Sequence, residues 1–273
     1  MFDSETGPVV AVAFDHGTEG AVRGGEDVPR MLRVISESRA DAILLTAGAA
    51  RHFKTPGSAA GQDIIAGLDI PVFGTRIGAG GSLVTTRQPW SPADARAAGA
   101  SMSKMLLPLG LEQVSEWADA VDRIARTGAA CAQMDMPLMV EPAFWGPDHN
   151  LTDQAILDAA RLCVELGATA LKVPNPADPV TLTRLNQWSP IPVLVLGGTP
   201  RDGGDFLAEV VSWMDAGAAG VVVGRNVWNR ADPVAAIDAL SLAVHEGDLQ
   251  RAHARMKEAG TPLYSPALHY DEG

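Results

Sequence analysis

Lys172 stands near the end of the apolar stretch ATALKVPNP (168–176), which is typical of a short buried strand. A charged side chain in such a strand is normally paired with an opposite charge or used in chemistry. The chain has only four lysines against seventeen arginines, and a second lysine, Lys104, also lies inside an apolar stretch. Arginine keeps its proton near neutral pH, whereas a lysine that is shielded from water beside another cation can lose it and attack a carbonyl carbon. The two lysines therefore predict imine chemistry.

Two carboxylates end apolar stretches in a similar way: Asp15 follows PVVAVAF (8–14), and Glu141 ends PLMVE (137–141). Side chains alternate between the two faces of a strand. Each charged residue therefore shares a face with apolar neighbours: Asp15 with Ala11 and Ala13, Lys172 with Ala168 and Ala170, Glu141 with Met139, and Lys104 with Met102 and Leu106. A lone buried lysine is more simply explained by an ammonium group that reaches the rim or pairs with a carboxylate. Four charged groups at corresponding positions favour a catalytic site.

Glycines cluster near the C-terminal end of the sequence, in PVLVLGGTPRDGGDF (192–206) and GVVVGRNVW (220–228). Gly197 and Gly198 would let backbone N–H groups approach an anion, and the residues after Gly224 would form a short helix whose N-terminus completes the site. Arg225 would add a positive charge. Glycines at strand ends are also ordinary turn residues, but two such elements in succession favour a phosphate or similar oxyanion.

The elements that must position these residues alternate along the chain as strand and helix. The expected strands are 8–14, 41–45, 71–75, 101–107, 137–141, 168–173, 192–197 and 220–224. The expected helices are 27–38, 58–67, 92–99, 111–134, 152–166, 178–187, 203–216 and 232–245, with one more surface helix after residue 247. Eight such units predict one domain over residues 1–273, an α/β fold of the (β/α)8 TIM barrel type. A doubly wound open sheet is the alternative.

The composition excludes several classes of partner. A formal net charge of −12 argues against binding to nucleic acid or to an anionic membrane, both of which need a basic surface. The N-terminal residues lack the features of a signal peptide, and no apolar run is long enough to span a membrane. Cys131 and Cys163 lie in helix-like segments and fit reduced thiols in a core. We therefore expect a soluble cytoplasmic protein.

Four motifs together carry a resemblance to a known family: AFDHG (13–17), ALKVPNP (170–176), the glycine pair at 197–198 with DFL (205–207), and AGAAGVVVGRNVWNR (216–230). They resemble the class I aldolases of the barrel group that holds archaeal-type fructose-bisphosphate aldolase, deoxyribose-phosphate aldolase and tagatose-bisphosphate aldolase.

Two further stretches, SKMLLPL (103–109) and MPLMVEP (136–142), are closer to tagatose-bisphosphate aldolase and its relative that cleaves sulfofructose phosphate. The chain departs from the archaeal-type enzymes in having no tyrosine near the fifth strand, because its only tyrosines are Tyr264 and Tyr270. It departs from deoxyribose-phosphate aldolase in having no lysine on strand seven.

The resemblance implies a role for each matched residue. Lys172 would form a Schiff base with the ketone of a phosphorylated sugar of the dihydroxyacetone phosphate type, and Glu141 would move the proton of the hydroxyl whose carbon becomes the aldehyde. Lys104 would lower the pKa of Lys172 and hold a substrate hydroxyl, while Asp15 would assist carbinolamine dehydration or orient hydroxyls. His16 would bind substrate, or simply bond to a neighbouring loop.

No metal or other cofactor is implied, and the six histidines show no ligand spacing. The resemblance further suggests a homo-oligomer. Other reactions stay open: a transaldolase-like synthase or a thiolase-like transferase of the same superfamily, a barrel isomerase without an imine, and a non-catalytic protein that binds a phosphorylated ligand.

Overall fold

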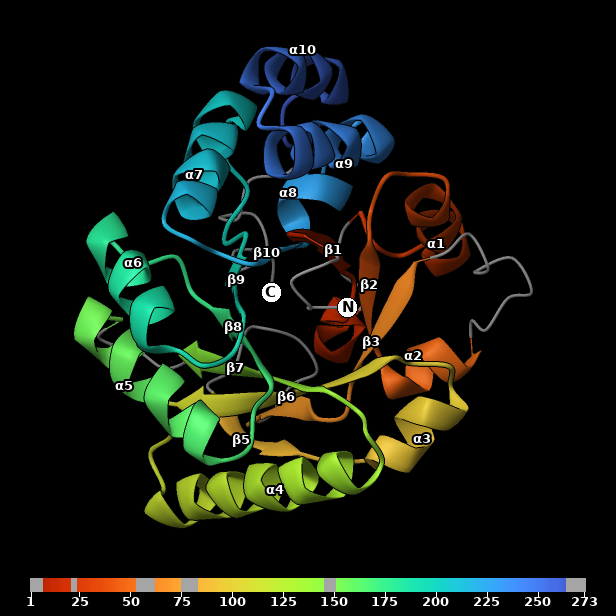
Figure 1. The fold of residues 1–273 in the computed structure, drawn as a ribbon. Coiled ribbons are helices and arrows are strands. Elements are labelled where there is room, and N and C mark those ends of the chain that lie inside the picture. The colour runs from red at the N-terminus through yellow and green to blue at the C-terminus, as the bar shows by residue number, and fades with distance from the viewer. Residues whose placement is uncertain (1–6, 21–23, 53–61, 75–82, 145–150, 264–273) are drawn as a thin grey trace.

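Eight parallel strands close into a barrel surrounded by helices (Figure 1). The computed structural model of the protein describes residues 7–20, 24–52, 62–74, 83–144 and 151–263. Around the barrel the strands follow the order β1-β10-β9-β8-β7-β6-β3-β2. Their bounds are β1 (Val9–Ala13), β2 (Ala42–Thr46), β3 (Asp63–Gly67), β6 (Met102–Leu109), β7 (Leu138–Phe144), β8 (Ala170–Val173), β9 (Val193–Leu196) and β10 (Gly220–Val223). The predicted TIM barrel is confirmed, and the open sheet is excluded because β10 pairs with β1.

Helices connect the strands and begin at polar caps. The longer helices are α1 (Val28–Ser36), α2 (Ala47–His52), α3 (Pro92–Ala97), α4 (Val114–Gln133), α5 (Asp153–Glu165), α6 (Pro179–Trp188), α7 (Gly203–Asp215), α9 (Pro233–Ser241) and α10 (Leu249–Ala259). Thr152, the N-cap of α5, accepts a hydrogen bond from the amide of Ala155. Aspartates cap α1, α6, α7, α9 and α10 in the same way, which satisfies amides that a helix start leaves unpaired.

The third strand lies elsewhere than predicted. The barrel strand is β3, within the segment 58–67 that was expected to be a helix, whereas β4 (Ile70–Phe73) lies outside the barrel. β4 pairs antiparallel with β5 (Leu83–Arg87) as a separate two-stranded sheet. Every residue of β4 is only partly buried, so its β-branched and aromatic composition marks a half-exposed ribbon and not a core strand. Residues 53–61 and 75–82 lie outside the described residues.

Two apolar layers fill the fold. The barrel interior contains Val9, Ala11, Ala13, Ala42, Leu44, Ile65, Met102, Met139, Ala170, Leu194 and Val222. A larger cluster, which includes Val10, Val12, Leu171 and Val173, lies between the barrel and its helices. The predicted faces are confirmed for all four charged residues, with one correction: Ala168 precedes β8 and packs in the outer cluster. Cys131 and Cys163 are buried free thiols of that cluster, as predicted.

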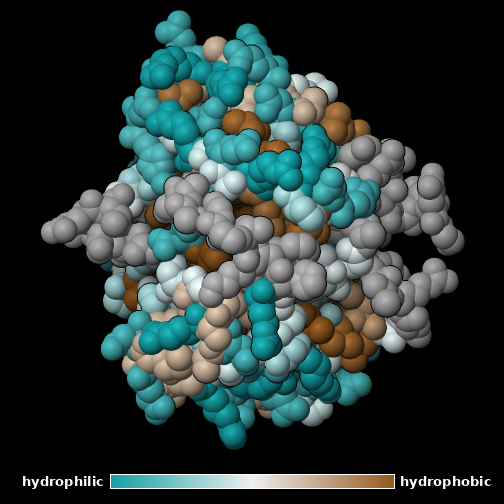
Figure 2. Space-filling model, turned by 90° about the vertical axis from the view of Figure 1, so that its right-hand side faces the viewer, coloured by the Kyte–Doolittle hydropathy of each residue, from teal (hydrophilic) through white to brown (hydrophobic). Residues whose placement is uncertain are grey.

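The surface beside α1, α2 and α3 is largely hydrophilic, with smaller hydrophobic areas near its middle (Figure 2). Elsewhere, large exposed apolar side chains such as Val114 and Val180 occur singly. Within the described ranges, no helix has both the length and the hydropathy that crossing a membrane requires.

Candidate active site

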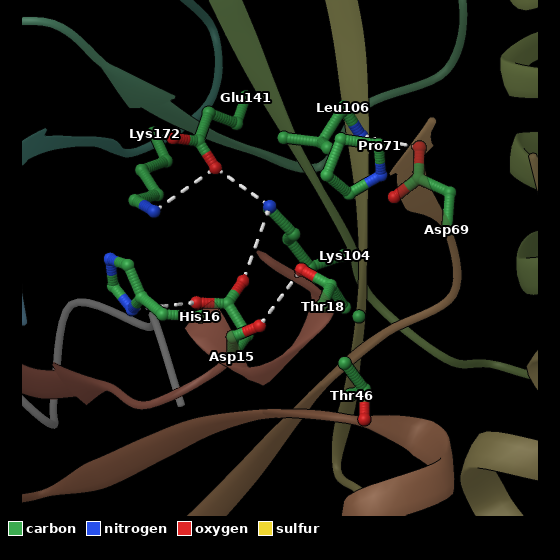
Figure 3. Close-up of a pocket in the computed structure, with 11 residues that line it drawn as sticks. Asp15, His16, Thr18, Thr46, Asp69, Pro71, Lys104, Leu106, Glu141 and Lys172 are labelled. Atoms are coloured by element: carbon green, nitrogen blue, oxygen red, sulfur yellow. Dashed lines mark hydrogen bonds and ion pairs between the residues drawn. The ribbon is translucent and has the colours of Figure 1, made fainter. Parts of the chain in front are cut away.

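A cavity of about 100 Å³ opens among the C-terminal ends of the barrel strands (Figure 3). It is lined by Asp15, His16, Thr18, Thr46, Gly67, Asp69, Pro71, Lys104, Leu106, Glu141 and Lys172. The structure thus brings together all four predicted catalytic residues and His16. This is the end of the barrel at which enzymes of this fold carry their active sites.

Both lysines contact the same oxygen of Glu141. The Oε2 atom of Glu141 lies 3.0 Å from Lys172 Nζ and 2.7 Å from Lys104 Nζ. Lys104 Nζ also lies 3.6 Å from Asp15 Oδ2. Lys104, Glu141 and Lys172 are 3%, 9% and 6% exposed. Two positive and two negative groups therefore balance one another, three of them buried, where an unpaired charge would be strongly destabilising.

The register of the strands explains why these side chains meet. Lys104 of β6 is paired with Gly67 on one side and with Met139 on the other, and Glu141 of β7 is paired with Leu106. Lys172 of β8 follows Ala170 at a spacing of two, so it lies above the apolar interior layer.

Burial and pairing compete for control of the pKa values in this cluster. Burial alone would raise the pKa of Glu141, but Lys104 and Lys172 outweigh it and hold this pKa below its ordinary value. Burial also opposes ionisation of Asp15, yet Lys104 and then Lys172 lower the pKa of Asp15 to about 2. Burial would lower the pKa of Lys104, but Glu141 and Asp15 raise it above its ordinary value. At neutral pH both carboxylates are ionised and Lys104 is a fixed cation.

His16 belongs to a short 3-10 helix (His16–Glu19) directly after Asp15. Its Nδ1 lies 3.8 Å from Asp15 Oδ1, and its ring meets the ring of Trp228 edge to face, with centroids 5.4 Å apart. Burial outweighs the neighbouring carboxylate and lowers the pKa of His16 to about 4. His16 is therefore neutral at pH 7 and can donate or accept a hydrogen bond.

The predicted phosphate-binding residues follow β9 and β10. Gly198 adopts a φ of +66°, a left-handed conformation that favours glycine. Gly224 precedes α8 (Arg225–Trp228), the short extra helix that the sequence predicted. A Cβ atom on Gly224 would lie 2.9 Å from the His16 ring, and one on Gly197 would lie 2.9 Å from a methyl group of Val223. Close packing thus favours glycine at these two positions, a reason separate from phosphate binding and from a role in turns.

Asn226 was missed by the sequence analysis, although it lies in the GRNVW motif. It is fully buried, and its Nδ2 donates to the carbonyl oxygens of Gly197 and Thr199 at 2.9 Å each. Its Oδ1 accepts from the amide of Arg201 at 3.0 Å. Asn226 therefore ties the loop after β9 to the start of α8.

Asp69 was also missed, because the third strand was assigned to the wrong segment. It lies two residues after β3 and is 5% exposed, and its Oδ2 accepts a hydrogen bond of 2.9 Å from the amide of Leu106. An acid just beyond a strand end is the same signal that identified Asp15. A correct assignment of β3 would have revealed Asp69 as well.

Comparison with known proteins places the chain in a family. Residues 9–230 match the DeoC/LacD family aldolase description. A fructose-bisphosphate aldolase class 1 from Halobacterium salinarum is 29% identical, over 89% of this chain and 92% of that protein. A 2-amino-3,7-dideoxy-D-threo-hept-6-ulosonate synthase from the same organism is 28% identical, over 90% and 91%.

Solved structures agree with this placement. The structure of an archaeal fructose 1,6-bisphosphate aldolase is similar with a TM-score of 0.75 and 26% identity, over 90% of this chain and 97% of that one. A second, described as the Schiff base forming fructose-1,6-bisphosphate aldolase, has the same TM-score and identity over 89% and 96%. The chain therefore belongs to the DeoC/LacD family of aldolases, and it is a lyase.

Proposed function

We propose that this protein is a class I aldolase in which Lys172 forms a Schiff base with the ketone of a phosphorylated ketose. The observation that carries this proposal is the buried Lys172 Nζ, 3.0 Å from an ionised Glu141 and beside the second cation, Lys104. A similar structure described as Schiff base forming supports the same chemistry.

The reaction begins with transfer of a proton from the Lys172 ammonium group to Glu141. The free amine attacks the ketone carbon to give a carbinolamine, and Glu141 returns its proton to the carbinolamine hydroxyl, which leaves as water. The restored carboxylate then removes the proton from the hydroxyl on the carbon that becomes the aldehyde. The carbon–carbon bond breaks, and its electron pair flows into the protonated imine.

Of the two roles that the resemblance implies for Asp15, we favour the orienting one. With a pKa of about 2 it holds no proton to donate to a leaving hydroxyl at neutral pH. We assign it to holding Lys104, whose fixed positive charge then stabilises the oxygen that develops negative charge. His16 binds a substrate oxygen as a neutral group.

The substrate phosphate is proposed to bind beside Gly198 and Arg225, on the loops after β9 and β10. A dihydroxyacetone phosphate-type donor fits this arrangement. A synthase that joins a similar donor to another acceptor is the second candidate, because the hept-6-ulosonate synthase is as similar to the chain as the fructose-bisphosphate aldolase. The cytoplasmic location and the homo-oligomeric state stay predictions.

Reductive trapping tests the imine. The protein is incubated with dihydroxyacetone phosphate and with a panel of ketose phosphates, borohydride is added, and the modified peptide is identified by mass spectrometry. We expect an adduct on Lys172 that disappears in Lys172→Met and persists in the control Lys257→Met, since Lys257 lies exposed on α10. Turnover without any adduct, or full activity in Lys172→Met, would contradict the proposal.

A further inference from the structure

Asp69 is a buried acid of the cavity for which the proposed reaction has no use. Its Oδ2 is bonded to the Leu106 amide of the adjacent strand β6, but its Oδ1 is shielded from solvent and has no hydrogen-bond partner among the described residues. Figure 3 shows Asp69 beside Pro71 and Leu106, on the side of the cavity away from Lys172. A buried polar atom without a partner is destabilising, and such atoms are rare enough in proteins that each calls for an explanation.

Burial favours the protonated form of Asp69. Lys104 is already paired with Asp15 and Glu141, and Lys172 with Glu141, so Asp69 is a third carboxyl group near Lys104. Burial raises the pKa of Asp69 to about 7, against the opposing effects of Lys104 and of the Leu106 amide; Glu141 also raises it, and Arg123 lowers it. Near neutral pH, Oδ1 is therefore available both as a hydroxyl donor and as an acceptor.

The topology of the barrel indicates which part of the substrate meets Asp69. In the closed order of strands, β3 lies directly across from β9. With the phosphate at the loops after β9 and β10 and the ketone carbon at Lys172 on β8, the far half of the substrate extends toward β6 and β3. This is the half that leaves as the aldehyde.

We propose that Asp69 is a specificity-determining residue whose Oδ1 binds a hydroxyl group on the aldehyde half of the substrate. The enzyme then selects aldehydes that carry a hydroxyl next to the carbonyl carbon. This inference rests on the proposed aldolase reaction, because it needs a substrate held by Lys172 at one end.

The test is the preference between two acceptor aldehydes in the condensation direction with dihydroxyacetone phosphate. Glyceraldehyde carries the hydroxyl, and 3-hydroxypropanal lacks it. We expect the wild-type protein to prefer glyceraldehyde at least about tenfold in kcat/KM, because the analogue leaves the buried Oδ1 unpaired. If the wild-type protein does not show this preference, the inference is overturned, and no variant is needed to decide it.

Substitutions then assign the preference to one side chain. Asp69→Asn keeps an acceptor for the Leu106 amide and an amide donor for the substrate, so the preference should persist. In Asp69→Leu, or in Asp69→Ala if the leucine variant does not fold, the ratio of kcat/KM for glyceraldehyde to kcat/KM for 3-hydroxypropanal should fall close to one. Asp63→Leu is the matched control, because Asp63 begins the same strand at the end of the barrel away from the cavity.

Two further outcomes separate the possible failures. Equal loss of activity with both aldehydes in Asp69→Leu would indicate a purely structural role and would overturn the inference. If borohydride still traps dihydroxyacetone phosphate on Lys172 in that variant, the proposed aldolase reaction survives this failure. If no adduct forms even in the wild-type protein, both proposals fall.

Discussion

Glu141 is the residue on which the charged cluster depends, because one of its oxygens contacts two ammonium groups. Without the carboxylate, the remaining ion pair of Lys104 within the described ranges is that to Asp15, at 3.6 Å, and Lys172 loses the partner that we assign as its proton acceptor. The charge of Glu141 thus contributes to both chemistry and folding.

Glu141→Gln separates these contributions. The amide keeps the shape of the side chain but cannot accept a proton, so we expect kcat to fall by about 10²–10⁴-fold. We also expect the free energy of unfolding to fall by about 3 kcal/mol, because buried positive charge is left unbalanced. Steady-state kinetics and urea unfolding measure the two effects. Glu165→Gln on the exposed surface of α5 is the control, and equal behaviour of the two variants would contradict the assignment.

At the scale of elements, the strand faces were predictable where the alternation of side chains was clear. From the sequence alone, the small residues of β1 and the corresponding position of Lys172 on β8 predict where the charged cluster lies. β3 was missed because DIIAG is short, ends in glycine and lacks a polar–apolar alternation. The neighbouring PVF has better strand propensity but packs as a ribbon outside the barrel, a tertiary property that local sequence does not encode.

Asn226 illustrates a second kind of information that is absent from local sequence. Its three hydrogen bonds reach residues 25 to 29 positions earlier in the chain, so only the closed barrel reveals them. The motif drew attention to glycine and arginine, whereas the side chain that joins the two loops is an amide.

We expect Asn226→Ala to weaken the binding of phosphorylated substrates in particular. Its three partners would each lose a hydrogen bond and the loops after β9 and β10 would separate, so KM for a ketose phosphate should rise at least about tenfold. Trapping of unphosphorylated dihydroxyacetone on Lys172 should change much less. Asn186→Ala removes one bond from Asn186 to the Ala216 carbonyl oxygen, between the ends of α6 and α7, and serves as the control. If Asn226→Ala impairs the binding of the ketose phosphate and the trapping of unphosphorylated dihydroxyacetone equally, phosphate binding at these loops is contradicted.

At the scale of the whole molecule, the acidic net charge works against the binding of an anionic substrate. The formal charge of −12 disfavours the approach of a phosphate, so recognition must come from local donors.

The cavity also contains two groups, His16 and Asp69, whose protonation changes when the chain unfolds. Their effects on global stability have opposite signs.

The pKa of His16 is about 4 in the folded protein, below the ordinary 6.5, so its contribution to stability is complete above pH 6.5 and is lost as the pH falls toward 4. The pKa of Asp69 is about 7, above the ordinary 3.8, so its contribution is present below pH 3.8 and is lost as the pH rises through 7.

The two contributions should separate in variants. The quantity to compare is the change in the free energy of unfolding between pH 4.5 and pH 7.5. Relative to the wild-type protein, His16→Gln should make this change less positive by about 2 kcal/mol, and Asp69→Asn should make it more positive by about 2 kcal/mol. Urea unfolding followed by tryptophan fluorescence at several pH values measures both. Parallel profiles for the wild-type protein and the two variants would contradict these pKa values.

Closure of the barrel between β1 and β10 has a consequence for synthesis of the chain. His16 follows the first strand, while the residues beside it, Gly224 and Trp228, come more than two hundred positions later. A ribosome must therefore release most of the polypeptide before β1 obtains its second neighbour and the pocket its final shape. A chain cut short before β10 would expose the edges of β1 and β9, so premature termination should yield an aggregating fragment and not a weakly active enzyme.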